Sequence, residues 1–272
     1  MIPPAFKYLR PTTVEEAIAL IAADEDAKVL AGGHSLLPIM KLRLAAPSAL
    51  VDIGRIEGLA YVREEGGVVS IGALTHHHDV ATSSLLAERV PLLAEAASFV
   101  GDPQVRHRGT IGGSIVHGDP ASDLPAAILA LDASLVLVGP NGTRVVLSSE
   151  FFLGFLETAT APDEILTEIQ IPEASGGFGF EKFTRRAQDW AIVGVAAQRR
   201  GDQVAVALVN MATTPVRATA TEEAINRGQG LEAAAALADE GTEPVSDQSA
   251  SSEYRRHLAR VLTARALAKA GF

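Results

Sequence analysis

The chain contains no cysteine among its 272 residues. It therefore forms no disulfide, holds no iron–sulfur cluster through thiolates and binds no zinc through sulfur. These three kinds of cross-link or metal centre are excluded from this chain, whatever its function.

The sequence also lacks long apolar runs and an excess of positive charge. No stretch approaches the roughly 20 apolar residues of a membrane span, and the first residues, MIPPAFKYLRP, do not have the pattern of a signal peptide. The net charge of −10 disfavours nucleic acids and anionic membranes as partners, because both bind basic surfaces. We expect a cytoplasmic protein with no membrane span. Any association with the inner face of a membrane would be through partner chains.

A run of three histidines, His76 to His78, raises the possibility of a metal site. Adjacent residues do not share one face of a helix, and no second group of ligands accompanies the run. We interpret the segment THHHDV as a helix capped by Thr75 with exposed histidines, and predict no metal site.

The predicted elements divide the chain into three parts, the first of which covers residues 1–53. Its segment RPTTVEEAIALIAAD has Thr12 followed three residues later by Glu15, a capping-box pattern that predicts a helix. Short strands, AKVLAGG and ALVDIG, follow. The second part, residues 54–175, has strands in GGVVSIGAL and EILTEIQIP, helices in LLAEAASFV and DLPAAILALDA, and a hairpin that turns at Asn141.

The third part covers residues 178–272. Its strands FGFEKFTRR and WAIVGVAAQRRGDQVAVALVNM are predicted to be antiparallel, with a turn at Gly201. Helices are predicted around ATEEAINR, LEAAAALA and SSEYRRHLARVLTARALAKAG. In the last of these, Tyr254, Leu258, Val261 and Leu262 form an apolar stripe, and we expect the basic face to be solvated.

Two pairs of glycines stand out, because each follows apolar residues and precedes a hydroxyl. The first is Gly32–Gly33 with Ser35, and the second is Gly112–Gly113 with Ser114. Glycine allows backbone N–H groups to converge on an anion, and the hydroxyls add donors, so two such loops can hold one diphosphate. The alternative is that both pairs form ordinary tight turns.

Other nucleotide and hydrolase motifs do not fit the spacing. No G-x-G-x-x-G follows a strand, and no G-x-x-x-x-G-K-[ST] is present. The segment GHSLL has Leu37 where the nucleophile elbow G-x-S-x-G needs its second glycine, so Ser35 is a poor candidate nucleophile.

At these two loops the sequence resembles the FAD-binding medium subunits of molybdenum hydroxylases, a family that includes aerobic carbon monoxide dehydrogenase and the FAD module of xanthine dehydrogenase. The resemblance rests on AGGHSLLPIMKLRLA and TIGGSIVHGDPASDLPA, and extends through IPPAFKYLRP, DPQVRHRGT, FEKFTRR with DWAIV, and SEYRRHLARVLTARAL. It is greatest to the carbon monoxide dehydrogenase medium subunit. The family fold that this implies is α+β: two α/β subdomains of the vanillyl-alcohol-oxidase (PCMH) type that hold FAD, at 1–53 and 54–175, and a C-terminal domain with a small antiparallel sheet and helices.

The resemblance also implies a set of FAD-binding residues. The diphosphate would be bound by two segments and their neighbours: Ala31, Gly32, Gly33, His34, Ser35 and Leu36 in the first, and Thr110, Ile111, Gly112, Gly113 and Ser114 in the second. Ser114 stands where many relatives have Asn, so that a hydroxyl donor replaces an amide donor at this contact.

Four further positions carry a role in the family, and three of them also have an ordinary alternative. Asp123 matches an acidic residue that binds cofactor hydroxyls, or caps the helix that follows. Lys182 matches a lysine near the flavin ring, or is a solvated strand lysine. Leu166 matches a leucine against the ring. Trp190 stands where relatives have a bulky residue beside the ring, or belongs to the core.

The activity implied by the resemblance is electron transfer, with no catalytic residue of the chain's own. A large partner subunit would hold the molybdenum cofactor, and a small one two [2Fe-2S] clusters, in a dimer of heterotrimers. FAD would pass electrons to quinone, NAD, oxygen or another acceptor. Two alternatives remain: a free-standing FAD oxidoreductase of the same fold, with Lys182 as its base, or a non-catalytic nucleotide-binding module.

Overall fold

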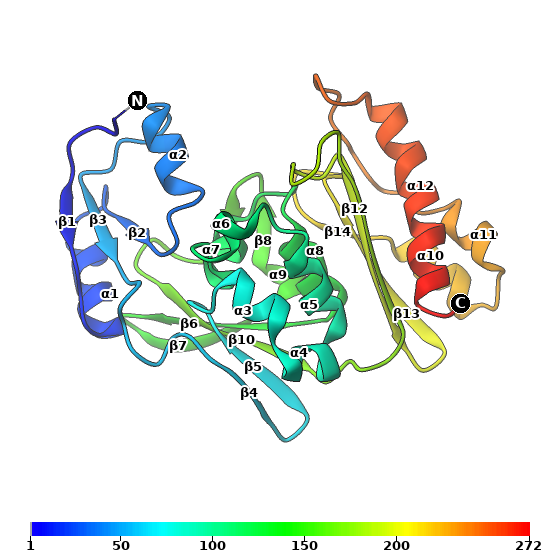
Figure 1. Cartoon of the computed structure of the whole chain (residues 1–272), viewed down its shortest axis with the longest axis horizontal. Coiled ribbons are helices and arrows are strands. Elements are labelled where there is room, and N and C mark those ends of the chain that lie inside the picture. The colour runs from blue at the N-terminus through cyan, green and yellow to red at the C-terminus, as the bar shows by residue number, and fades with distance from the viewer. Residues whose placement is uncertain (1) are drawn as a thin grey trace.

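Three main β-sheets follow one another along the chain in the computed structural model, which describes residues 2–272 (Figure 1). Each is accompanied by its own helices, and the buried apolar residues form three clusters. The architecture is α+β, as predicted.

The N-terminal lobe is a small parallel sheet with the order β1-β3-β2. Its elements are β1 (Lys7–Leu9), α1 (Val14–Ala22), β2 (Lys28–Leu30), α2 (Leu36–Lys41) and β3 (Ala49–Asp52). The capping box of α1 lies one residue later than predicted, because Thr13, not Thr12, accepts the hydrogen bond from the N–H of Glu16. The Glu16 carboxylate reaches back to the N–H of Thr12 at 2.7 Å, so that Glu16, not Glu15, closes the box.

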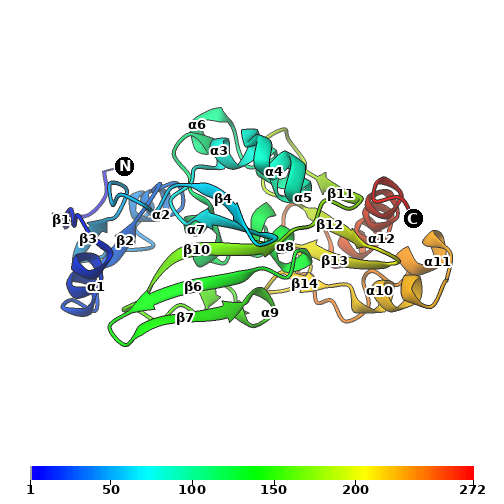
Figure 2. The ribbon, with the colours of Figure 1, turned by 90° about the horizontal axis from the view of Figure 1, so that it is seen from below.

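The middle of the molecule is an antiparallel sheet with the order β4-β5-β10-β6-β7. Its strands are β4 (Val62–Glu65), β5 (Val68–Gly72), β6 (Ser134–Gly139), β7 (Gly142–Leu147) and β10 (Ile165–Pro172). Figure 2 shows that the helices cover one face of this sheet and leave the other open. They are α3 (His77–Thr82), α4 (Ser84–Arg89), α5 (Pro91–Ser98), α6 (Pro103–Arg106), α7 (Ile111–His117), α8 (Asp123–Ala130) and α9 (Ser148–Phe151), and a small ribbon, β8 (Phe152–Gly154) with β9 (Glu157–Thr158), follows. The predicted hairpin forms, with Gly142 at a φ of 105°.

The third sheet, β11-β12-β13-β14, is covered on both faces. Its elements are β11 (Phe178–Phe183), β12 (Val193–Arg200), β13 (Gln203–Val209) and β14 (Val216–Arg217), with α10 (Thr219–Asn226), α11 (Leu231–Ala235) and α12 (Ser252–Lys269) on the outer side. Ala196 and Ala207 belong to the core shared with the middle helices, whereas Val195 and Val206 belong to the core under α12. Alternate residues of one strand thus serve two different cores.

The last helix departs from its predicted pattern. Leu258 and Leu262 are buried, but Tyr254 is exposed. The basic face is not simply solvated: Arg255 is buried, and Arg260 makes a bidentate ion pair with Asp239 at 2.6 and 2.7 Å. These arginines fasten α12 to the chain segment before it, a tertiary arrangement that helix periodicity does not encode.

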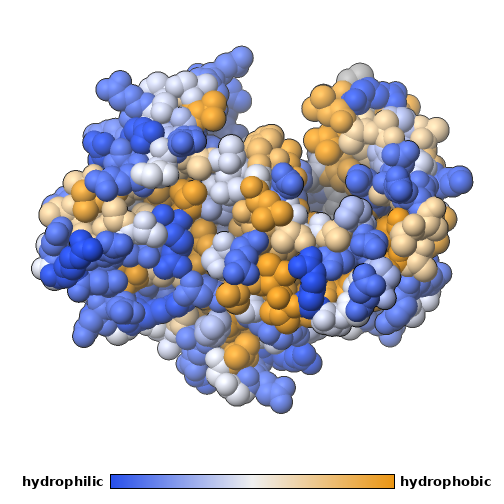
Figure 3. All heavy atoms as spheres, turned by 180° about the vertical axis from the view of Figure 1, so that it is seen from behind, coloured by the Kyte–Doolittle hydropathy of each residue, from blue (hydrophilic) through white to orange (hydrophobic). Residues whose placement is uncertain are grey.

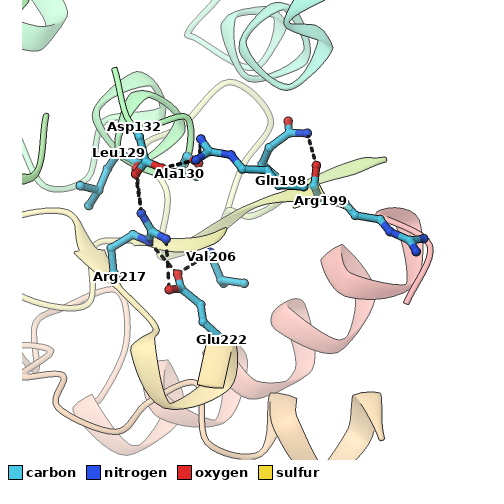
Figure 4. Close-up of polar contacts among 9 residues, drawn as sticks. Leu129, Ala130, Asp132, Gln198, Arg199, Val206, Arg217 and Glu222 are labelled. Carbon is cyan, nitrogen blue, oxygen red and sulfur yellow. Dashed lines mark hydrogen bonds and ion pairs between the residues drawn. The ribbon is translucent and has the colours of Figure 1, made fainter. Parts of the chain in front are cut away.

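An ion-pair cluster joins the third sheet to the end of α8 (Figure 4). Arg217 contacts Asp132 at 2.8 Å and Glu222 at 2.6 Å, and donates to the carbonyl of Leu129. Arg200 pairs with the same Asp132 and donates to the Ala130 carbonyl. The cluster therefore satisfies carbonyls in the last turn of α8 with cationic donors, which the helix dipole favours.

Close packing of α12 on β11 depends on Gly179, because a Cβ at this position would collide with the carbonyl of Ala266. We expect Gly179→Ala to lower the free energy of unfolding by about 1–3 kcal/mol, since backbone must move to make room. The free energy of unfolding is measured by urea denaturation followed by circular dichroism. Gly230→Ala is the control, because nothing lies within 4 Å of a Cβ there. An equal loss in both variants would contradict the packing argument.

Candidate functional site

A cavity of about 890 Å³ lies between the N-terminal lobe, the helices of the middle sheet and the start of the third sheet. In the space-filling view, a hollow opens between the lobe that carries α2 and the lobe that carries α12 (Figure 3). Both predicted glycine loops line this cavity, although they are separated by almost 80 positions in the sequence.

The first loop, Ala31–Ser35, connects β2 to α2 and presents free backbone donors. Gly33 has a φ of 75°, which a residue with a side chain adopts only with strain. Gly32 lies against the second loop, since a Cβ on it would collide with the carbonyl of Arg108. Within residues 2–272, the N–H groups of residues 32–36 make no hydrogen bond. Five consecutive unpaired donors are therefore available to an anion.

The second loop is the start of helix α7 and not a nest of free N–H groups. Thr110 is the N-cap, and its hydroxyl accepts from the N–H of Gly113 at 3.2 Å. The N–H groups of Ile111 and Gly112 donate to the carbonyls of Thr75 and Ala73 at 3.0 and 2.9 Å. The expectation that both loops offer equivalent donors is therefore wrong: the first loop holds the free N–H groups, and the second supplies a helix N-terminus.

The two glycines of the second loop leave room for different neighbours. A Cβ at Gly112 would lie 2.5 Å from the Cβ of Ala73, and one at Gly113 would lie 2.9 Å from the Thr110 hydroxyl. Gly113 is helical and does not have a positive φ. Ile111 is fully buried and does not line the cavity, so the structure does not place it with the other predicted site residues.

Asp123 and Lys182 form a buried ion pair at the cavity wall. Their Oδ2 and Nζ atoms are 2.8 Å apart, the side chains are 6% and 5% exposed, and Lys182 also donates to the carbonyl of Phe99. Lys182 is therefore not a solvated strand lysine, and the N-cap of α8 is Ser122, not Asp123. Burial raises the pKa of Asp123 to about 6, although Lys182 opposes the rise. Its other oxygen, Oδ1, is buried without a partner in residues 2–272, so the site has unused hydrogen-bonding capacity.

The remaining predicted residues also lie on the cavity, with different exposures. Leu166 is buried and contributes an apolar wall. Trp190 is 56% exposed at the rim and is not a core residue. His34, Leu36 and Ser114 complete the set, and the Ser114 hydroxyl contacts that of Ser122 at 2.9 Å.

His77 is a cavity residue that the sequence did not reveal. The histidine run was expected to be exposed behind a Thr75 cap, but His76 is the N-cap of α3 and His77 is only 4% exposed. Thr75 instead hydrogen-bonds through its hydroxyl to the backbone of Tyr61. Residues 75–77 pair with residues 109–111 in an antiparallel bridge that buries His77. Pairing across 34 positions leaves no local signal in the sequence.

The charge state of His77 follows from its burial. Desolvation, together with the neighbouring His76, His34 and Arg106, lowers the pKa of the imidazole to about 4. His77 is therefore neutral at physiological pH. In the part of the chain that the structure describes, no group of three or more histidine or carboxylate side chains is arranged to hold a metal ion.

Two family models cover almost the whole chain. Residues 4–174 match the FAD binding domain in molybdopterin dehydrogenase, and residues 178–270 match the CO dehydrogenase flavoprotein C-terminal domain. The carbon monoxide dehydrogenase medium chain of Hydrogenophaga pseudoflava is 44% identical, with 98% of this chain and 97% of the relative covered. The nicotine 6-hydroxylase medium subunit of Paenarthrobacter nicotinovorans is 35% identical, with 98% of each covered.

The solved structures agree with the sequence comparison. A structure of carbon monoxide dehydrogenase from Hydrogenophaga pseudoflava superposes with a TM-score of 0.94 at 45% identity, over 99% of this chain and 98% of that one. Quinoline 2-oxidoreductase from Pseudomonas putida 86 gives 0.93 at 32% identity, over the same shares. The chain belongs to the family of FAD-binding medium subunits of molybdenum hydroxylases of the carbon monoxide dehydrogenase type. The resemblance and the fold predicted from the sequence are confirmed.

The burial of His77 predicts a pH dependence of stability. In the unfolded chain the imidazole binds a proton below about pH 6.5, whereas in the folded chain it binds one only near pH 4. The unfolded state therefore binds more protons between these values, and stability is lost as the pH falls. We expect the His77 contribution to decrease by about 3 kcal/mol from pH 6.5 to 4.

The measurement compares the unfolding free energy of the native chain and of His77→Gln across this range. The difference between the two isolates His77 from Asp123, whose raised pKa acts in the opposite direction and is present in both proteins. A difference that does not change with pH would show that the pKa of His77 is the same in the folded and the unfolded chain.

Proposed function

We propose that this chain holds FAD in the cavity between its two glycine loops and transfers electrons within a molybdenum hydroxylase complex. Electrons from [2Fe-2S] clusters of a small partner subunit would reach the flavin and leave to an external acceptor. A large partner subunit would hold the molybdenum cofactor. The observation that carries the proposal is the meeting of a loop of free N–H groups, a helix N-terminus and a buried carboxylate–lysine pair on one cavity.

The residues present fit a flavin dinucleotide. The diphosphate would be bound by the free N–H groups of residues 32–36 and the hydroxyl of Ser35, and Gly113 and Ser114 at the start of α7 line the same space. A hydrogen bond to a charged group contributes about 1.5–3 kcal/mol. Several of them support binding in a chain of net charge −10, because charges further than about 8 Å away are screened at physiological salt.

The other end of the cavity fits an apolar ring with polar edges. Leu166 is buried against the space, Trp190 lies at its rim, and Lys182 is held in place by Asp123. The unpaired Oδ1 of Asp123 would complete its hydrogen bonding with a donor of the cofactor. When bound, FAD supplies the one- and two-electron chemistry, and these residues position it.

The chain itself supports a relay and not a substrate site. It has no cysteine for a cluster, and relatives of nearly the same length belong to enzymes named for carbon monoxide, nicotine and quinoline. We infer that the partner subunits select the substrate, with carbon monoxide as the first candidate. A dimer of heterotrimers in the cytoplasm remains part of this proposal. Within residues 2–272, no helix has the length and apolar character needed to cross a membrane.

One prediction of this proposal is that FAD is bound noncovalently. Acid precipitation of the yellow protein should release FAD into the supernatant. Gly33→Ala should weaken FAD binding at least about tenfold, because Gly33 has a φ of 75° and a shift there moves the free N–H groups. Gly58→Ala is the matched control, with a φ of 81° and open space around its Cβ. Equal FAD affinity in the two variants would mean that the first glycine pair is only a turn.

Another prediction concerns the transfer of electrons from the partner subunits to the flavin. We expect the isolated chain with FAD bound to show no reduction of the flavin by carbon monoxide, purines or N-heterocycles, because it holds no cluster to deliver electrons. Addition of the molybdenum and iron–sulfur subunits should restore substrate-dependent bleaching near 450 nm. Rapid bleaching in the isolated chain would instead assign it to the free-standing flavin oxidoreductases.

A further inference from the structure

Helix α3 and the second glycine loop are joined by a short antiparallel pairing. The N–H of His77 donates to the carbonyl of Gly109, and the N–H of Ile111 donates to the carbonyl of Thr75, both at 3.0 Å. His76 and Thr110 form the bridge between them. This pairing fixes the His77 ring on the wall of the cavity, at the loop against which Gly32 packs.

The contacts of the ring define which nitrogen faces the cavity. A Cβ at Gly109 would lie 2.7 Å from Cδ2 and 3.0 Å from Nε2 of His77, so this edge of the ring lies against a residue without a side chain. The opposite nitrogen, Nδ1, is completely enclosed and has no partner in residues 2–272. Nε2 makes no hydrogen bond in this part of the chain and is not fully enclosed as Nδ1 is. Because His77 lines the cavity, Nε2 is the ring nitrogen that has access to it.

The enclosure of Nδ1 favours one tautomer. A neutral imidazole has one N–H and one lone pair. A buried N–H without an acceptor is rarer in proteins than an acceptor without a donor. The proton therefore belongs on Nε2, where it needs an acceptor that this chain does not provide.

We propose that the Nε2–H of His77 donates a hydrogen bond to the diphosphate of FAD, which makes His77 a binding residue outside both glycine motifs. The proposal rests on the proposed function. The diphosphate is the acceptor of choice because His77 borders Gly109 and Thr110, where the two loops meet. A neutral donor suits this place, since it binds an anion without adding a buried charge.

The tautomer is tested without any cofactor. The native chain, labelled with ¹⁵N-histidine, is measured by long-range proton–nitrogen NMR between pH 6 and 8. We expect the His77 signals of an Nε2–H tautomer with a bare Nδ1, and a shift of Nε2 when FAD or ADP is added. An Nδ1–H tautomer, or no shift of Nε2 on binding, would overturn the proposal.

The contribution to binding is tested with two variants and a control. His77→Phe keeps a ring but has no donor, and should raise the Kd for FAD and for ADP about tenfold, the value of one such hydrogen bond. His77→Gln keeps an N–H near the position of Nε2 and should bind within about threefold of the native chain. His78 lies on the same helix, but its ring contacts that of His107 at a centroid distance of 4.0 Å and does not line the cavity, so His78→Phe should not change either Kd.

Folding and fragment binding distinguish the possible failures. Melting curves establish that each variant is folded before its Kd is compared. If His77→Phe lost affinity for riboflavin but not for ADP, the acceptor would lie on the flavin ring, and the assignment to the diphosphate would be overturned. Native affinity in His77→Phe would refute the role of His77 and leave the proposed function intact, whereas a native chain that binds no FAD would refute the proposed function itself.

Discussion

The buried pair of Asp123 and Lys182 connects the cavity between the two glycine loops to the rest of the molecule. Asp123 begins α8 and Lys182 lies on β11, so one ion pair links the middle helices to the third sheet. Neither charge is stable there alone, because an unpaired buried charge costs several kcal/mol. The position of α8 relative to β11 is therefore tied to the position of the two groups that face the cavity.

The opposite end of α8 is held to the same sheet by Arg200 and Arg217. A helix of eight buried residues is thus fixed at both ends by charged side chains from one sheet. This arrangement explains how a short helix can present Asp123 at a constant place. The loop of free N–H groups differs, since its conformation depends on Gly33 and on contact with Arg108, and not on ion pairs.

Much of this fold could be predicted from the sequence, because the strands, the hairpin at Asn141 and the helices follow local periodicity and turn residues. The two glycine loops could be recognised as partners through their motifs. The roles of their N–H groups could not, since Ile111 and Gly112 donate to carbonyls of a segment that is distant in the sequence. His77 was missed for the same reason: burial by a bridge between distant segments has no local pattern. The functions of the individual site residues remain predictions.

The alternation along β12 and β13 has a consequence for how such proteins can evolve. Ala196 and Ala207 complete the core of the preceding helices, so the boundary between the two family models, at 174 and 178, does not coincide with a boundary between cores. The two segments can be recognised separately in sequences, but they were not free to be exchanged as independent modules. A foreign C-terminal segment would need small residues facing α8, and also arginines that donate to the carbonyls in the last turn of α8. Recombination at this junction is therefore constrained by packing rather than by chain connectivity.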